Sequence, residues 1–245
     1  MAPATTKTPL LKQPSSAGAV GSRPLILSAA DVRAVLNGTK TQHRIALRQR
    51  IAGHPTYLTE EEANVAGWYD VFERGRDLDG AGIEEVARPI KSPFGVPGDR
   101  LYVKEAHAWV DYLVGSELDD PVCVAFKADR TAYSFAGNKP VKLDTYAWPW
   151  DRIKWRSPAL MPRWASRLTL VVESVRVQRL QDISEEDALA EGIAIDCGHV
   201  YKVRDYDWFG HMTARGCMET WWGMKGRKFE AWVFALTFKR PEGGR

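Results

Sequence analysis

Residues 25–44 read LILSAADVRAVLNGTKTQHR, and this stretch places three structural signals in immediate succession. The apolar residues Leu25 to Leu27 predict a short strand. Ser28, followed by Asp31 three residues later, has the spacing of a capping box and predicts a helix that begins at once. Gly38 predicts the end of this helix, because glycine adopts the left-handed conformation that closes helices at no steric cost.

The turn after this helix carries Lys40 among other polar residues. Within the helix, Val32, Val35 and Leu36 lie at helical spacing and form one apolar stripe. A helix docked on the core by such a stripe holds the following turn, residues 39–44, in a fixed place. Fixed placement is what a binding or catalytic site requires, so this turn is the first candidate for a functional role.

Four later segments carry similarly clear signals. They are a strand over Arg100–Glu105 after the turn residues Pro97-Gly98-Asp99, a long strand from Ser166 through Val177, a helix that opens at Ser184 and ends at Gly192, and a last strand over Ala231–Phe238. In the long strand the apolar residues change parity between Val172 and Val175, which predicts a β-bulge near Glu173-Ser174.

The stretches between these segments lack clear periodicity. We expect a flexible tail over residues 1–22, because its Pro, Ser, Ala and Thr residues cannot bury enough apolar surface to offset the entropy of ordering them. We expect residues 23–245 to form a single domain with long irregular insertions at about 46–97, 106–162 and 194–228.

The chain has an ordinary globular composition and a neutral body. Of its 245 residues, 44% are hydrophobic and 27% are charged, so a real core is expected. Lys7, Lys12 and Arg23 place three of the 34 basic residues in the first 23 positions, which leaves 31 basic residues against 31 acidic ones. Any phosphate-binding surface must therefore be a local patch, since the body has no excess of positive charge.

Cysteine usage and hydropathy favour the cytoplasm. Cys123, Cys197 and Cys217 are too few, and odd in number, for a secreted disulfide framework, which favours a reducing compartment. The sequence has no signal-peptide pattern and no apolar run long enough to cross a membrane. We therefore expect a cytoplasmic protein with no membrane partner.

The order of these motifs resembles the ASCH family of the PUA-like superfamily, in particular its long members from phages and prophages. The matching segments are Gly-Thr-Lys-Thr-Gln-x-Arg at 38–44, Pro-Gly-Asp-Arg-Leu-x-Val-x-Glu at 97–105, Met-Pro-Arg-Trp-Ala-Ser-Arg at 161–167, Ile-Ser-Glu-Glu-Asp-Ala-x-x-Glu-Gly-Ile at 183–193 and a closing Phe-Lys strand. Together they cover about a third of the chain. The resemblance implies an α+β fold with a small mixed or antiparallel PUA-like β-barrel flanked by helices.

The resemblance also implies a protein that binds RNA or nucleotides, in a host cytoplasm if it is phage-encoded. One small bacterial branch of the family is an amidohydrolase acting on N4-acetylcytidine, and it uses a Lys, a Thr three residues later and a Glu on the later helix. The matching positions here are Lys40, His43 and Glu191, which are our candidate catalytic residues. The chain departs from the family at His43, where Thr is usual, and at Ile45, where a basic residue is common.

Amide hydrolysis needs a group that activates a nucleophile, a donor for the developing oxyanion and an acid for the leaving amine. Lys40 beside Glu191 has a proton affinity set by burial against ion pairing, and His43 can relay a proton. The alternative is a salt bridge between Lys40 and Glu191 that only ties the turn to the helix, with His43 partly exposed.

Further residues are candidates for binding a nucleoside or a nucleic acid. They are Thr41, Arg44, Tyr102, Glu105, Arg163, Trp164 and Arg167. Arginines pair with phosphates, and Tyr102, Trp109 or Trp164 can stack on a base. The alternative for the aromatic residues is packing in the core, and for Glu105 it is a surface pair with a neighbouring basic residue.

Three functions stay open. They are recognition of a nucleobase or modified nucleoside, with hydrolysis of an N-acyl group as its enzymatic form, a non-catalytic module that binds RNA or DNA, with RNA the favoured partner, and a structural or partner-binding phage protein. We expect no cofactor, because the sequence contains no phosphate-loop, esterase or metalloprotease motif. We expect no metal either, because Cys197, His199, His211 and Cys217 match no standard zinc spacing.

Overall fold

The computed structural model describes eight segments of the chain. They are residues 21–47, 67–74, 85–110, 123–135, 141–143, 150–196, 200–203 and 211–241, with side chains described for all of these except 68–74 and 85–89. The tail predicted over residues 1–22 lies outside the described residues apart from Gly21 and Ser22.

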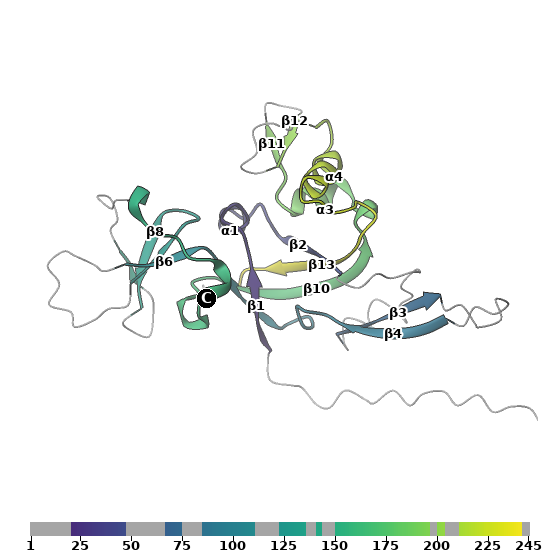
Figure 1. The fold of residues 1–245 in the computed structure, drawn as a ribbon, viewed down its shortest axis with the longest axis horizontal. Coiled ribbons are helices and arrows are strands. Elements are labelled where there is room, and N and C mark those ends of the chain that lie inside the picture. Colours follow the sequence, from purple (N-terminus) through teal and green to yellow (C-terminus); the bar gives the residue numbers. More distant parts are fainter. Residues whose placement is uncertain are drawn as a thin grey trace, which may run out of the picture.

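A five-stranded sheet forms the centre of the molecule (Figure 1). In spatial order its strands are β1 (Ser22–Ile26), β5 (Arg100–Lys104), β10 (Thr169–Arg179), β13 (Trp232–Lys239) and β2 (Gln42–Ala46). β1 is parallel to β5, and every other neighbouring pair is antiparallel. In the described part of the chain β1 and β2 are the edges of this sheet, which is open there. The strands predicted from residues 25, 100, 166 and 231 onward are confirmed as β1, β5, β10 and β13.

β10 contains the predicted bulge. Its pairing with β13 shifts register between Val172 and Ser174. Leu170 and Val172 are buried before the shift, and Val175 and Val177 are buried after it, all in one hydrophobic core. The extra residue thus lets both halves of the strand face the same core although their apolar residues differ in parity.

Helix α1 (Ala29–Leu36) follows β1 and buries Val32 and Val35 in the same core. The capping box is confirmed: Asp31 N donates to Ser28 Oγ at 3.1 Å, and Ser28 Oγ and N donate to the Asp31 carboxylate at 2.7 and 3.4 Å. Such a cap stabilises a helix by about 1 kcal/mol. Gly38 has φ +76°, as predicted for the residue that closes the helix.

A second sheet lies on the left of Figure 1 and is built from residues that we expected to be irregular. Its strands are β6 (His107–Val110), β7 (Cys123–Phe126), β8 (Thr131–Ser134) and β9 (Val141–Lys142), and the 3-10 helices η1 (Trp150–Arg152), η2 (Pro158–Leu160) and η3 (Arg163–Ala165) follow in the chain. The expectation of irregular structure is therefore wrong for the described part of this insertion. All four residues of β7 are buried, and a short apolar run without alternation has no period that distinguishes a strand from a helix.

The other two insertions also contain regular structure. β3 (Trp68–Arg74) and β4 (Glu85–Lys91) form an antiparallel pair on the right of Figure 1. β11 (Ala194–Asp196) pairs with β12 (Val200–Lys202). The predicted irregularity is wrong for these segments too, because cross-strand pairing stabilises strands whose own sequences are short or polar.

Two helices pack together above the central sheet in Figure 1. The predicted helix is α3 (Glu185–Ala190), which follows the 3-10 turn η4 (Leu180–Asp182). Its partner, α4 (Ala214–Met224), was not predicted. One face of α4 is buried, and the residues on it are Ala214, Cys217, Met218 and Trp222. Their helical spacing was the missed signal.

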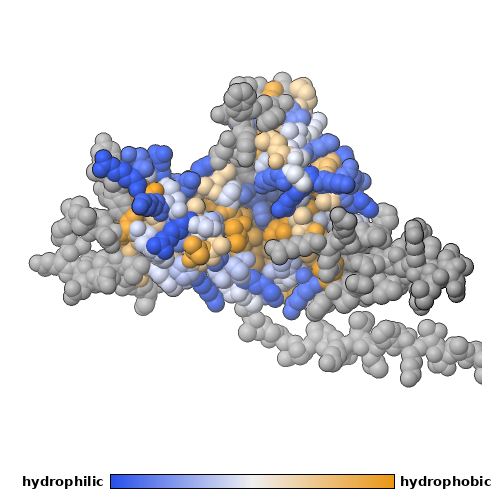
Figure 2. Space-filling view, in the orientation of Figure 1, coloured by the Kyte–Doolittle hydropathy of each residue, from blue (hydrophilic) through white to orange (hydrophobic). Residues whose placement is uncertain are grey.

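The described residues form an α+β fold with most regular structure in strands and few helices. On the face seen in Figure 2, hydrophobic residues gather over the centre of the molecule, where Figure 1 places β1, β10 and β13, and hydrophilic residues surround them. No helix in the described segments is both long and apolar enough to cross a membrane.

Candidate functional site

The turn at Lys40 is attached to both α3 and the central sheet through the backbone of Thr41. Thr41 N donates to Ala190 O at 2.8 Å, and Phe238 N donates to Thr41 O at 2.9 Å. Thr41 thus joins the end of α3 to β13, while its own side chain is exposed. These bonds bring the Lys40 turn and Glu191 together although they are far apart in the sequence.

Lys40 and Glu191 form a buried ion pair. Lys40 Nζ lies 2.6 Å from Glu191 Oε2, and the two side chains are 0% and 3% exposed. The same Nζ donates to the backbone oxygen of Glu191 at 2.8 Å and lies 3.3 Å from Asp31 Oδ1. Three oxygens therefore surround the three N–H donors of this ammonium group.

Arg44 extends this contact into a network. Its Nη1 donates to Glu191 Oε1 at 3.2 Å and to Gln42 Oε1 at 2.9 Å, and its Nη2 donates to Asp187 Oδ2 at 2.6 Å. Asp187 also accepts from Arg176 Nη2 at 2.8 Å and from Gln42 Nε2 at 2.7 Å. Both carboxylates are thus held by several charge-assisted hydrogen bonds.

The charges in this network balance. We call it the ion cluster, and its charged members are the cations Lys40, Arg44 and Arg176 and the acids Asp31, Asp187 and Glu191. Burial by itself would raise the pKa of Glu191, but the charge of Lys40, with those of His43 and Arg44, outweighs burial and the pKa lies below its ordinary value. For Asp187 the hydrogen bond from Gln42 and the charges of Arg44 and Arg176 likewise outweigh burial and lower the pKa.

The geometry of Lys40 and Glu191 matches the salt bridge that we gave as the alternative to catalysis. An ammonium group whose donors all face oxygens carries no lone pair, so Lys40 must leave this contact before it can act as a nucleophile or base. His43 is half-buried and close enough to influence Glu191. The three predicted catalytic residues are therefore neighbours, in an arrangement that fixes the turn to α3.

Arg167 is the centre of a second buried contact. Its Nε and Nη2 donate to the two oxygens of Glu105, each at 2.9 Å, and its Nη1 donates to Asp129 Oδ2 at 2.8 Å. These ion pairs outweigh the effect of burial and raise the pKa of Arg167. Glu105 is thus a buried partner of Arg167, which does not match the surface pair with a neighbouring basic residue that we gave as the alternative for it.

Four residues named in the sequence analysis, Tyr102, Trp109, Arg163 and Trp164, take part in aromatic contacts at and around η3. Trp164 is 50% exposed and stacks on Trp109, with ring centroids 5.3 Å apart and planes at 22°. Phe135 meets Trp164 edge-on at 5.7 Å, and the exposed Arg163 places its guanidinium carbon 5.6 Å from the centroid of Tyr102. We call these five residues the Trp164 ledge.

The predicted site residues thus fall into two groups by their place in the fold. Lys40, Thr41, His43, Arg44 and Glu191 belong to the ion cluster or border it, and Tyr102, Glu105, Arg163, Trp164 and Arg167 gather around β5 and η3. Sequence reasoning missed Asp31, Gln42, Asp187 and Asp129. Asp31 and Asp187 had a visible signal as capping residues, but their second role depends on tertiary contacts.

The residues considered for a zinc site are only partly described. Cys197 and His199 lie outside the described residues. Cys217 Sγ donates to Tyr201 O at 2.8 Å, and His211 Nε2 lies 2.8 Å from Thr220 Oγ1. Within the described segments no group of three or more His, Cys, Asp or Glu residues is arranged to hold a metal ion.

No protein family, curated protein or solved structure matches this chain.

Replacing Glu191 by Gln should lower the free energy of unfolding at pH 7 by about 3 kcal/mol, because Lys40 and Arg44 then stay buried with one anion fewer. The difference should shrink on acidification. The pKa of Glu191 is lower in the folded protein, so its ionised form stabilises the fold above a pH of about 4.3, and this stabilisation is lost as the pH falls through the folded pKa. Denaturant titrations from neutral to acidic pH measure both effects.

Glu173→Gln is the matched control. Glu173 pairs with Lys239 at 3.3 Å, but their side chains are 41% and 63% exposed, so solvent screens the pair and its loss should change stability by no more than about 0.5 kcal/mol. Equal costs for the two variants at pH 7 would show that the ion cluster does not hold the fold.

Proposed function

We propose that this chain binds single-stranded nucleic acid, RNA in preference to DNA, through the Trp164 ledge, without a chemical step. The observation that carries the proposal is Trp164 itself, a large aromatic ring that is half exposed and supported from beneath by Trp109 and from the side by Phe135. Packing that fixes an indole while leaving its outer part in water makes a stacking platform.

Stacking of a base on an exposed aromatic ring contributes about 1–3 kcal/mol and tolerates any base, since every base has a π-face. Arg163 precedes Trp164 in the chain, is exposed and lies over the ring of Tyr102, so it supplies a guanidinium group for the phosphate backbone. The neutral body of the chain requires such a local patch, because the overall charge attracts no nucleic acid.

We further propose that the chain is a cytoplasmic, phage-type member of the ASCH branch of the PUA-like superfamily. Two observations support this proposal. The motifs occur in the order found in that family, and the motif that contains Lys40 contacts the motif that contains Glu191. On this proposal the five-stranded central sheet corresponds to the PUA-like barrel. We favour RNA over DNA because RNA presents unpaired, unstacked bases in its loops, bulges and ends, and aromatic side chains stack on such bases.

Trp164→Ala should weaken binding to a fluorescent single-stranded RNA by about tenfold, which is the loss of one stacking contact. Arg163→Ala should weaken it less and reduce its dependence on salt. Leu160→Ala is the matched control, because Leu160 is 68% exposed and lies just before the ledge in the chain. Fluorescence anisotropy at two salt concentrations measures these effects.

Equal affinities of Trp164→Ala, Leu160→Ala and the wild type would reject the ledge as the binding surface. No RNA affinity in the wild-type protein, combined with a stable protein complex recovered from infected cells, would favour the structural or partner-binding alternative.

Hydrolysis of an N-acylated nucleobase is a second candidate function. It is supported by the contact between Lys40 and Glu191 and by the influence of His43 on Glu191, which gather the three family positions at one point. Substrate binding would have to draw the Lys40 ammonium out of its three contacts. His43 would then transfer a proton in place of the Thr hydroxyl of the family.

Incubation with N4-acetylcytidine tests this candidate, with free acetate measured by chromatography. The wild type should release acetate, and Lys40→Met should reduce the rate at least about a hundredfold, as expected for loss of an acid–base group. Lys239→Met, at an exposed lysine, is the control, and circular dichroism checks that both variants fold. Equal turnover in Lys40→Met and Lys239→Met would exclude the assignment.

A further inference from the structure

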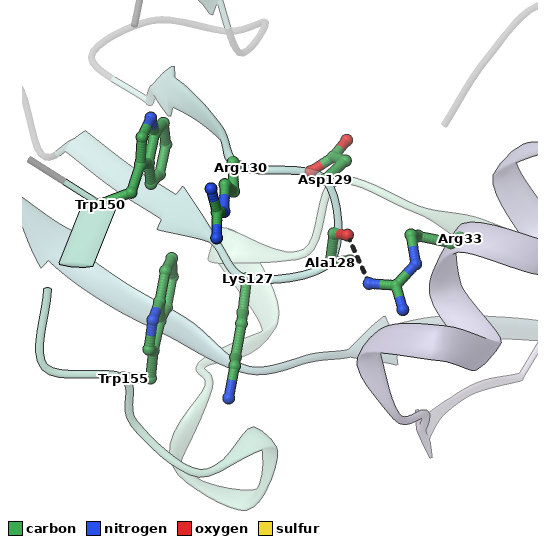
Figure 3. Close-up of a pocket in the computed structure, with 7 residues that line it drawn as sticks. All are labelled: Arg33, Lys127, Ala128, Asp129, Arg130, Trp150 and Trp155. Atoms are coloured by element: carbon green, nitrogen blue, oxygen red, sulfur yellow. Dashed lines mark hydrogen bonds between the residues drawn. The ribbon is translucent and has the colours of Figure 1, made fainter. Parts of the chain in front are cut away.

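A concave site lies between α1 and the second sheet, and Asp129 is the one residue of its lining that takes part in a contact described above. The pocket has a volume of about 420 Å³ and is lined by Arg33, Lys127, Ala128, Asp129, Arg130, Trp150 and Trp155. Figure 3 shows the two tryptophans on one side, Arg33 on the opposite side, and Lys127 and Arg130 between them. Its size is in the range of pockets that hold small molecules.

The pocket is strongly cationic. Three of its lining residues, Arg33, Lys127 and Arg130, are basic, and one, Asp129, is acidic. Arg167 already holds the Asp129 carboxylate, through Nη1 at 2.8 Å and Nη2 at 3.0 Å. Arg167 binds Asp129 as well as Glu105, and Lys127 and Arg130 outnumber this one carboxylate, so a ligand in the pocket meets an excess of positive charge. This is an environment for an anion with more than one charge.

The position of Arg33 is fixed. Its Nη1 donates to Ala128 O at 2.8 Å, across the gap between α1 and the turn after β7, as drawn in Figure 3. This bond orients the guanidinium group at the edge of the pocket.

The other wall of the pocket is aromatic. The indole rings of Trp150 and Trp155 are nearly parallel, with planes at 6° and centroids 6.3 Å apart. Because the two faces share one orientation, a flat ring that lies against one indole is aligned with the other. Both tryptophans are half-buried, so they are held by the protein and still reach the pocket. A planar aromatic group is the ligand that such a wall selects.

Arg130 has a backbone conformation that is unfavourable for arginine. Its φ is +51°, which makes it the one non-glycine residue with positive φ in the described segments. It is the last residue of the turn that joins Phe126 of β7 to its partner Thr131 of β8. Glycine adopts this conformation without strain, and arginine does not. This strained residue contributes a cation to the pocket. Strained backbone conformations cluster at sites that bind ligands, which supports a functional role for the pocket.

We infer that this pocket binds a nucleoside 5′-phosphate, with the base against Trp150 and Trp155 and the phosphates beside Arg130, Lys127 and Arg33. A planar aromatic ring and a multiply charged anion in one small molecule are the two features that this wall and this charge require. The inference goes beyond the proposed function, since it needs neither the Trp164 ledge nor the ion cluster. The ligand is either a free nucleotide or the 5′-phosphorylated end of a strand.

Isothermal titration calorimetry of the full chain with ATP, AMP, adenosine and inorganic tripolyphosphate tests the inference. Affinity should rise from adenosine through AMP to ATP. Arg130→Gly should weaken ATP binding about tenfold, the loss of one charge-assisted contact, and should raise Tm because the strain is relieved. Trp155→Ala should weaken binding of ATP but leave that of tripolyphosphate unchanged. Lys228→Ala, at an exposed lysine elsewhere, is the control and should change neither.

Higher stability combined with weaker binding in Arg130→Gly is a result that misfolding cannot produce. No heat of binding at millimolar ATP, or equal ATP affinities for Arg130→Gly, Trp155→Ala and Lys228→Ala, would overturn the inference. Loss of ATP binding in Trp164→Ala would also overturn it, because the ligand would then lie on the ledge. Oligonucleotides with a 5′-phosphate or a 5′-hydroxyl distinguish the two sources: tighter binding of the phosphorylated strand than of ATP identifies a strand end.

Discussion

The Lys40 ammonium has no contact with solvent, so the fold must supply its anions. Two carboxylates surround it, that of Asp31 at the start of α1 and that of Glu191 at the end of α3, and the backbone oxygen of Glu191 accepts a further hydrogen bond. A buried ion pair contributes little net stability over a well-packed apolar contact, but removing one partner leaves a buried charge at a cost of several kcal/mol. The pair therefore contributes mainly to the specificity of the fold and little to its net stability. The charge of Lys40 is paired only when α1, the turn before the edge strand β2, and α3 meet at this point. The ion pair between Arg44 in β2 and Asp187 in α3 favours the same arrangement.

The segments with strong local signals were predictable, and the reasons are physical. Ser28 and Asp31 form a capping box from residues within one turn of each other, so it can be read from the local sequence. Gly38 adopts a positive φ that needs no contact with another part of the chain. The bulge in β10 follows from its buried apolar residues, which lie at even positions up to Val172 and at odd positions from Val175 onward. A strand with one buried face can bury both groups only if one extra residue separates them. The contact between Lys40 and Glu191 was predicted from a family resemblance and could not be derived from spacing. Asp187 illustrates the limit: it looked like a capping residue, but its side chain binds Gln42, Arg44 and Arg176 instead of the backbone at the helix start.

The insertion at 106–162 was the least predictable part of the chain, and it contributes residues to both of the binding surfaces that we propose. Trp109 and Phe135 support the ledge, and the turn after β7 together with η1 forms the cationic pocket. Arg167 connects this insertion to the central sheet, because it binds Glu105 just after β5 and Asp129 in that turn. Buried charges thus join this insertion to the central sheet, and the exposed Lys127 and Arg130 lie in the turn between β7 and β8, at the pocket for which we propose a ligand. Short strands stabilised by pairing across long loops give little local signal, which is why these elements were missed.

A double-mutant cycle in urea denaturation, with Lys40→Met, Glu191→Gln and the combined variant, measures the coupling between the two side chains. If the buried pair determines how the turn meets α3, the double variant should be more stable than the sum of the single losses predicts, by about 2 kcal/mol. Losses that add to within about 0.5 kcal/mol would mean that the two groups act independently, and the arrangement described here would be contradicted.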